Sequence, residues 1–174
     1  MFYRFIFILG LFFSFLNANI FTDIKSFKAQ FIQTITNSSS SNIEYKGEVF
    51  IKSNGKILWK YKTPVIKNVY INQNFAIVDE PELEQAIFTS LEREINIIKL
   101  LNNAKKIDEN NYKAKVYNIE YNIFVKDNQI SSISYSDELE NKVLISFFDV
   151  QQNIVIDDMI FKFAAPDYYD IIRK

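Results

Sequence analysis

Between residues 27 and 85 the chain alternates apolar and polar side chains, which is the pattern of strands that bury one face. The apolar series is mostly aromatic or branched, and it is centred on Trp59, the only tryptophan in the chain. The alternation predicts strands over 28–36, 43–53, 57–62 and 75–78, with further extended segments around Val69 and Ile71 and from Leu83 to Ile87. A sheet with a long, aromatic and concave apolar face is therefore expected.

Helical patterns interrupt these strands at two places. Thr89 followed by Glu92 is a capping-box signature for a helix from Ser90 to about Asn102. The apolar stripe of this helix comprises Leu91, Ile95, Ile98 and Leu101. A shorter helix of about two turns is expected near the start of the chain, where apolar residues recur at helical spacing. Its apolar residues are Ile20, Ile24 and Phe27.

The second half of the chain again has the pattern of strands. They are expected over 112–117, 119–126, 130–135, 142–149 and 159–163, separated by turn clusters such as Asp127-Asn128-Gln129. Many short antiparallel strands combined with two or three helices favour the α+β class. We therefore expect a single domain in which one strongly curved antiparallel sheet wraps around helices.

The loop at Asn54 and Gly55 allows two registers for the hairpin between the second and third expected strands. A two-residue loop would place Trp59 beside Phe50 and would send Val49 to the opposite face. A three-residue loop that includes Lys56 would place Tyr45, Val49 and Ile51 on the same face as Ile57, Trp59 and Tyr61. A slip of one residue exchanges the two faces of a strand. We prefer the three-residue loop because it gathers more apolar side chains on one face.

The first 18 residues have the three parts of a secretory signal peptide. Met1 to Arg4 is a short positive start, Phe5 to Leu16 is apolar and uncharged, and Ala18 offers a small residue for cleavage. About 12 apolar residues are too few for a membrane span, which takes about 20. The expected mature chain is therefore residues 19–174, exported and soluble, with a retained N-terminal anchor as the alternative.

The composition excludes most catalytic chemistry. The chain has no histidine and no cysteine, which excludes Ser-His-Asp and Cys-His sites, the usual zinc ligand sets, disulfides and a lipid-modified cysteine. A net charge of −1 offers no basic patch for nucleic acid. The remaining candidates are carboxylates: Asp157 with Asp158, or Glu80 with Glu82 and Glu84, could act as an acid–base pair, and the stretch from Asp79 to Glu84 could hold a metal. Interleaved charges of this kind usually form a solvated surface, so no catalytic residue, metal or cofactor is expected.

A series of short sequence marks occurs in the order found in a known family. The marks are Phe27-Lys28-Ala29-Gln30-Phe31-Ile32-Gln33, Tyr45-Lys46-Gly47, Ile51-Lys52, Ile57-Leu58-Trp59-Lys60-Tyr61 with Pro64, and Pro81-Glu82-Leu83-Glu84-Gln85. The tail Phe161-Lys162-Phe163-Ala164-Ala165-Pro166, followed by Asp170-Ile171-Ile172, also looks like the closing strand of that family. In these marks the chain resembles the periplasmic outer-membrane lipoprotein carrier family (LolA) over nearly all of residues 19–174.

The resemblance implies an incomplete β-barrel with covering helices that enclose an apolar cavity, into which the acyl chains of a lipoprotein enter. The helix from Ser90 to Asn102 would be part of this lid. Many members carry Arg-Pro where this chain has Ser53-Asn54, and that Arg is thought to latch the lid helices, so Ser53 would offer only a neutral hydroxyl there. The residues implied to bind the acyl chains of the cargo are Phe31, Tyr45, Val49, Ile51, Ile57, Trp59, Val69, Ile71, Phe75, Leu83, Leu91, Ile95 and Ile98.

The function implied by the resemblance is that of a periplasmic chaperone, which takes acylated lipoproteins released from the inner membrane and shuttles them to the outer membrane. The implied partners are the inner-membrane lipoprotein-releasing ABC transporter and an outer-membrane acceptor or the membrane itself. A monomer that binds no nucleic acid is expected. Two alternatives stay open: another exported lipid-binding or envelope-sensing module on the same scaffold, and an enzyme that acts through carboxylates such as Asp157 and Asp158.

Overall fold

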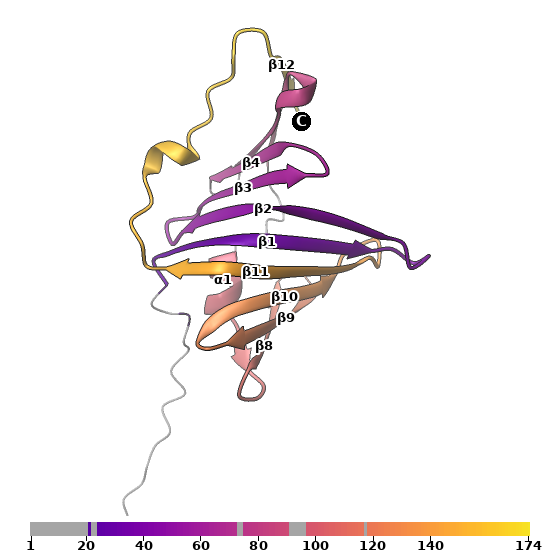
Figure 1. The fold of residues 1–174 in the computed structure, drawn as a ribbon, viewed down its shortest axis with the longest axis vertical. Helices are drawn as coiled ribbons and strands as arrows, with labels where there is room; N and C mark the ends of the chain where they lie inside the picture. The colour runs from indigo at the N-terminus through magenta and orange to yellow at the C-terminus, as the bar shows by residue number, and fades with distance from the viewer. Residues whose placement is uncertain (1–20, 22–23, 73–74, 91–96, 117) are drawn as a thin grey trace, which may run out of the picture.

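One twelve-stranded sheet dominates the computed structural model, which describes residue 21 and residues 24–72, 75–90, 97–116 and 118–174 (Figure 1). The strand order is β12-β6-β5-β4-β3-β2-β1-β11-β10-β9-β8-β7. The strands are β1 (Ser26–Thr36), β2 (Asn42–Lys52), β3 (Lys56–Thr63), β4 (Lys67–Asn72), β5 (Phe75–Glu80), β6 (Gln85–Ser90), β7 (Lys105–Lys106), β8 (Asn111–Val116), β9 (Ile119–Lys126), β10 (Gln129–Ser136), β11 (Lys142–Gln152) and β12 (Asp170–Arg173). The described part also contains the α-helix α1 (Ile97–Asn102) and the 3-10 helices η1 (Pro81–Leu83) and η2 (Asp158–Phe161).

Most strands expected from the alternation are present, and three local expectations are corrected. Ser90 is the last residue of β6 and lies opposite Phe75, so the expected helix does not begin there, and Leu91 to Asn96 fall outside the described residues. Phe27 lies in β1, so the short opening helix does not extend to it, and Ile20 lies outside the described residues. Residues 159–163 do not form a strand: η2 (Asp158–Phe161) occupies the first three of them, and the closing strand is β12, which pairs in parallel with β6.

The hairpin between β2 and β3 has the expected faces but a different loop. Val49 lies opposite Trp59 and Ile51 lies opposite Ile57, so the apolar residues of both strands share one face. The three loop residues are 53–55, and Lys56 is the first residue of β3, not part of the loop. The register is therefore shifted by two residues from the expected one, and a shift of two preserves the face of every side chain.

The core lies on one side of this sheet, which we call the inner face, and we call the opposite side the outer face. The inner face carries Phe31, Val49 and Ile57, and it shares one buried cluster with residues of β8 to β11 and with Leu100 and Leu101 of α1. Strands β3 and β8 are far apart in the strand order, so a single cluster that includes both requires the sheet to curve around the inner face. The sheet is thus strongly curved, as expected, and within the described ranges the short helix α1 adds only Leu100 and Leu101 to the core, so the expected set of covering helices is not confirmed.

The segment after β11 covers part of the outer face before it reaches β12. Figure 1 shows this yellow segment passing along the side of the molecule to the far edge of the sheet. The ring of Phe163 packs against Tyr70 at 5.6 Å and against Phe88 at 6.1 Å between centroids. Leu58 on the outer face is fully buried. The chain therefore protects apolar side chains on both faces of β3 to β6.

Two lysines of the β2–β3 hairpin hold this segment through one carboxylate. Lys52 Nζ lies 2.6 Å from Asp158 Oδ1, and Lys56 Nζ lies 3.1 Å from Asp158 Oδ2. These donors lower the pKa of Asp158, chiefly through the hydrogen bond from Lys52 and then that from Lys56. Asp157 accepts a hydrogen bond from the backbone N–H of Met159 at 2.9 Å and so caps η2. Asp157 and Asp158, the pair considered for acid–base catalysis, thus both have structural partners.

Candidate binding face

The sheet register brings the central expected site residues together on the inner face. Phe31 lies opposite Gly47, Val49 lies opposite Trp59, and Trp59 lies in turn opposite Val69. Direct cross-strand neighbours have Cβ atoms about 5 Å apart, so these side chains touch in a continuous apolar surface. The members of the expected set that lie on this surface are Phe31, Tyr45, Val49, Ile51, Ile57, Trp59, Val69 and Ile71.

Phe31 needs a glycine beside it. A Cβ atom on Gly47 would meet the backbone carbonyl oxygen of Lys60, and it would also lie 2.9 Å from the Phe31 ring. The absence of a side chain at this position lets the Phe31 ring lie over the backbone of β2. From there the ring contacts Trp59 at 4.9 Å and Tyr61 at 5.2 Å, both edge to face.

The side chains of the inner face are fully buried at one end of the strands and become more exposed toward the other end. At the end that includes Ile51 and Ile57, both side chains have an exposure of 0%. Further along the same strands Trp59 is half-buried, and Ile43 at the start of β2 is 52% exposed. The apolar surface is therefore closed at one end and accessible at the other.

A polar collar surrounds the accessible end of this surface, formed by Gln33, Tyr61, Lys67 and Tyr135. The hydroxyl of Tyr61 donates a hydrogen bond to Gln33 Oε1 at 3.2 Å. Lys67 Nζ lies 4.6 Å from the Tyr61 ring centroid and 5.4 Å from that of Tyr45, within the range of a cation–π interaction. Four different strands, β1, β3, β4 and β10, thus contribute polar groups at the margin of an apolar face.

Burial keeps the phenols of the collar neutral. The pKa of Tyr61 is raised, first by burial and then by the neighbouring Tyr135 and Tyr45. Burial also raises the pKa of Tyr135 to about 12, with smaller contributions from Tyr121 and Asp137. Tyr135 on β10 raises the pKa of Tyr61 on β3, although three strands lie between β10 and β3 in the sheet. The curvature of the sheet therefore brings these two side chains toward each other.

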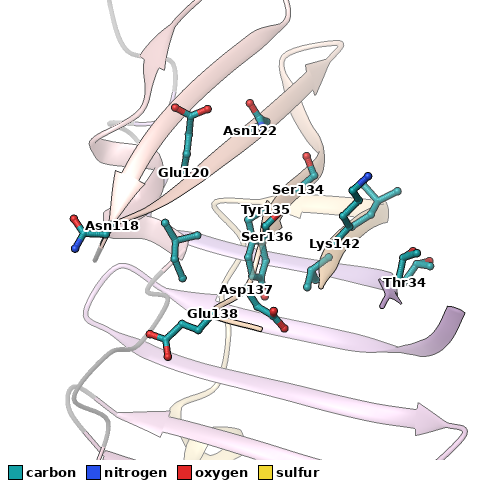
Figure 2. Close-up of a pocket in the computed structure, with 14 residues that line it drawn as sticks. Thr34, Asn118, Glu120, Asn122, Ser134, Tyr135, Ser136, Asp137, Glu138 and Lys142 are labelled. Atoms are coloured by element: carbon teal, nitrogen blue, oxygen red, sulfur yellow. The ribbon is translucent and has the colours of Figure 1, made fainter. Parts of the chain in front are cut away.

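A pocket of about 910 Å³ lies at the same ends of the strands but mostly on the outer face, where Thr34, Ser134 and Leu144 share one side of the sheet. Figure 2 shows Tyr135, Asp137 and Glu138 lining it with Lys142 and Thr34. Its apolar lining comes from Ile119, Val143 and Leu144. The pocket is mixed in character and differs from the closed apolar end of the inner face.

Five residues of the expected set lie elsewhere or outside the description. Phe75 lies on the outer face, where its ring contacts Phe88 at 5.8 Å, and this corrects the expectation that it lines the same concavity as Trp59. Leu83 lies in η1 and is 65% exposed, so it is not part of the inner face either. Leu91 and Ile95 fall outside the described residues; Ile98 belongs to α1, but its side chain is outside the description.

Ser53, at the expected latch position, lies in the turn between β2 and β3. Its backbone N–H donates to the carbonyl oxygen of Lys25 at 2.8 Å, and its side chain is exposed. The turn therefore contacts the backbone that leads into β1. The role of its hydroxyl as a latch stays a prediction.

The polar collar is not predicted by the apolar alternation, which marks only apolar side chains. Lys67 occupies the same alternation as Val69 and Ile71, and Gln33 continues that of Phe31. Polar residues in inward positions at the ends of strands were a signal that could have been used. The electrostatic effect of Tyr135 on Tyr61 depends on the curvature of the sheet, which the local pattern does not contain.

Other kinds of site find no support in the described ranges. No group of three or more Asp, Glu, His or Cys side chains there could hold a metal ion. No helix within them is long and apolar enough to cross a membrane.

Comparisons with known proteins agree on one family. The sequence profile described as "Outer membrane lipoprotein carrier protein LolA" matches residues 22–164. An outer-membrane lipoprotein carrier protein of Campylobacter jejuni is 40% identical over 151 residues, which cover 87% of this chain and 88% of that protein. The protein of the same name from Wolinella succinogenes is 35% identical over 155 residues, which cover 88% of this chain and 90% of that protein.

A solved structure shares the fold. The crystal structure of a LolA superfamily protein from Nitrosomonas europaea superposes with a TM-score of 0.55 at 12% identity and covers 81% of this chain and 91% of that chain. At this identity the likeness speaks for the fold alone, whereas the profile and the sequence relatives span most of the chain. The chain therefore belongs to the outer-membrane lipoprotein carrier (LolA) family.

Proposed function

We propose that this protein is a lipoprotein carrier that binds the acyl chains of its cargo on the inner face. The observation that carries the proposal is the continuous apolar surface from Ile51 and Ile57 to Trp59, which is closed at one end and accessible at the other. The names of its relatives in Campylobacter and Wolinella support the same cargo class. The apolar residues of this surface supply binding energy and no reactive group, which fits a chaperone and not an enzyme.

Such a carrier must shield a large hydrocarbon surface from water. An acyl chain exposes about fifteen methylene groups, each worth roughly 0.8 kcal/mol on burial, so an acylated protein is poorly soluble in water. A carrier must cover enough of that surface to prevent aggregation, yet it must also release the chains at the target membrane. The closed and open states of the carrier should therefore differ by only a few kcal/mol.

The cellular setting follows from the same proposal. The carrier would work in the periplasm as a soluble monomer after removal of residues 1–18. It would receive acylated lipoproteins from the releasing ABC transporter of the inner membrane and deliver them to an outer-membrane acceptor or to the membrane itself. Helix α1 would form part of the lid over the acyl chains, because Leu100 and Leu101 are already buried against the inner face.

A second candidate is another exported lipid-binding or envelope-sensing module. It is favoured by the fact that an aliphatic and aromatic surface binds hydrocarbon whatever the attached headgroup. The two candidates differ in cargo. A carrier binds acylated protein, whereas the alternative binds free lipid or a signalling partner.

The experiment uses Trp59 as its own reporter, because the chain has no other tryptophan. Titration with a soluble diacylated lipopeptide should shift the emission of Trp59 to shorter wavelength and protect it from iodide quenching. Trp59→Glu, with the lipopeptide itself labelled, should weaken binding at least about tenfold, because a carboxylate would be desolvated by the acyl chains.

Phe50→Glu is the matched control. Phe50 lies on the outer face of the neighbouring strand, with Lys28 and Lys60 at 5.6 Å and 5.8 Å from its ring. A glutamate there would face two lysines, so the binding of the lipopeptide should hardly change. Equal losses from Trp59→Glu and Phe50→Glu would show that the acyl chains do not bind on the inner face.

A further inference from the structure

The polar collar has the composition of a binding site for hydrogen-bond acceptors. Lys67 contributes an ammonium group, Tyr61 a hydroxyl and Gln33 an amide N–H₂, and all three are half-buried beside the apolar surface. Within the described residues, no carboxylate forms an ion pair with Lys67, whose ammonium lies over the rings of Tyr61 and Tyr45. A positive group held in this way at the margin of a hydrocarbon site is available to an uncharged acceptor.

The position of the collar sets which part of a ligand it can reach. Acyl chains that extend toward Ile57 at the closed end would have their other ends near Trp59 and Tyr61, where burial decreases. In a diacylated cargo the chains end in ester groups, whose carbonyl oxygens accept hydrogen bonds but cannot donate. A collar of donors therefore complements the point where two acyl chains meet their glycerol.

The raised pKa values of the phenols agree with this assignment. Burial raises the pKa of Tyr61 and of Tyr135, so both hydroxyls stay protonated, and able to donate, at every physiological pH. The Tyr61 hydroxyl donates to Gln33 in the empty protein, and that bond would be exchanged for one to the ligand. The exchange replaces one neutral hydrogen bond with another and costs little.

We propose that Gln33, Tyr61, Lys67 and Tyr135 recognise the ester carbonyl groups of a diacylglyceryl ligand. The inference rests on the proposed function, since it takes the inner face as the site of the acyl chains. The shared chemistry is the diacylglyceryl ester, which occurs in lipid-modified cysteine and in phospholipids alike. The collar thus makes the protein selective for glycerol-linked acyl chains over hydrocarbon in general.

The test compares two ligands of equal hydrocarbon content. A dipalmitoylglyceryl-cysteine lipopeptide carries two ester carbonyls, and its dihexadecyl ether analogue lacks both. The wild-type protein should bind the ester about tenfold more tightly than the ether, the size expected of one charge-assisted hydrogen bond. Lys67→Met and Tyr61→Phe should each reduce this ratio toward one while the affinity for the ether stays unchanged.

Matched controls come from the same strands. Lys60→Met removes a lysine from the outer face of β3 and should leave the ratio at its wild-type value. A third ligand, dipalmitoyl phosphatidylglycerol, separates the two sources of the ester. Preference for the lipopeptide over this phospholipid would identify lipid-modified cysteine as the source, and equal binding would identify the glyceryl ester alone.

The outcomes separate the inference from the function on which it rests. Equal affinity of the wild-type protein for ester and ether ligands would overturn the inference and leave the carrier function intact. A ratio that Lys67→Met and Tyr61→Phe do not change would also overturn it. If neither ligand binds, the proposed function fails, and the assignment of the collar fails with it.

Discussion

Gly47 is the residue on which the packing of the inner face depends most directly. A Cβ atom there would meet the backbone carbonyl oxygen of Lys60, which cannot rotate away. We expect Gly47→Ala to destabilise the protein by about 1–3 kcal/mol, the usual cost of overpacking, as measured by urea unfolding. Glu44→Ala on the same strand, where the side chain is exposed, should change stability by less than about 0.5 kcal/mol. Similar losses at both positions would contradict this account of the Phe31 packing.

Ser53 offers a second test at the same scale. An Arg at this turn could donate charge-assisted hydrogen bonds worth about 1.5–3 kcal/mol to backbone carbonyls, against about 1 for a neutral hydroxyl. Ser53→Arg should therefore raise the melting temperature of the empty protein and slow the uptake of cargo from donor membranes. Ser53→Ala serves as the control and should affect both only slightly. If uptake and melting are unchanged in Ser53→Arg, the lid is not controlled at this position.

Residue alternation predicted the faces of β2 and β3 correctly, but not the details of the loop. Both possible three-residue loops place Val49 and Trp59 on one face, so the sequence could not distinguish residues 53–55 from a loop that includes Lys56. The outward placement of Phe75 was missed for a related reason. An exposed aromatic residue at the start of a strand fits either face until the pairing with β4 is known.

At the scale of elements, the attachment of the C-terminal segment makes a prediction about pH. The pKa of Asp158 lies below its ordinary value of 3.8, so the ion pairs stabilise the folded protein above about pH 4 and this contribution is lost as the pH falls through the lowered pKa. Asp158→Asn should therefore lower the melting temperature more at pH 7 than at pH 3. The same substitution should expose residues 154–169 to limited proteolysis at pH 7.

Asp167→Asn is the control for this effect, because Asp167 is an exposed carboxylate in the same segment. It should melt like the wild type at both pH values. A difference between Asp158→Asn and the wild type that is equally large at pH 3 and pH 7 would show that the carboxylate charge does not hold the segment.

Long alternating segments were predictable as strands, and the helix expected up to about Asn102 is present as α1, which ends at that residue. Its expected start at Ser90 was wrong, because Ser90 still pairs with Phe75 as part of β6. The pattern of residues 159–163 suggested a strand, but the Asp157 carboxylate caps η2, and β12 already occupies the edge of β6 that β5 leaves open. Pairing between strands distant in sequence decides such cases, and a local window does not contain it.

At the scale of the whole molecule, the curvature is the property that the alternation implied least directly. Register shifts occur between Lys28 and Gln30 in the β1–β11 pair, between Lys46 and Gly47 in the β2–β3 pair, and between Ile130 and Ser132 in the β9–β10 pair. Such bulges increase the local twist of a sheet. They help the sheet to close around one core, and no residue pattern in the sequence marked them. The single antiparallel sheet was predictable, but the approach of Tyr135 to Tyr61 was not.

The central claim is that the inner face carries the acyl chains of a lipoprotein. Native mass spectrometry of the protein released gently from the periplasm tests it most directly, because it weighs the bound cargo and identifies it after dissociation. We predict complexes of one carrier with one acylated protein for the wild type and for Phe50→Glu, and empty protein for Trp59→Glu. Wild-type protein that emerges empty or with free lipid alone, or a Trp59→Glu variant that keeps its acylated cargo, would contradict the claim.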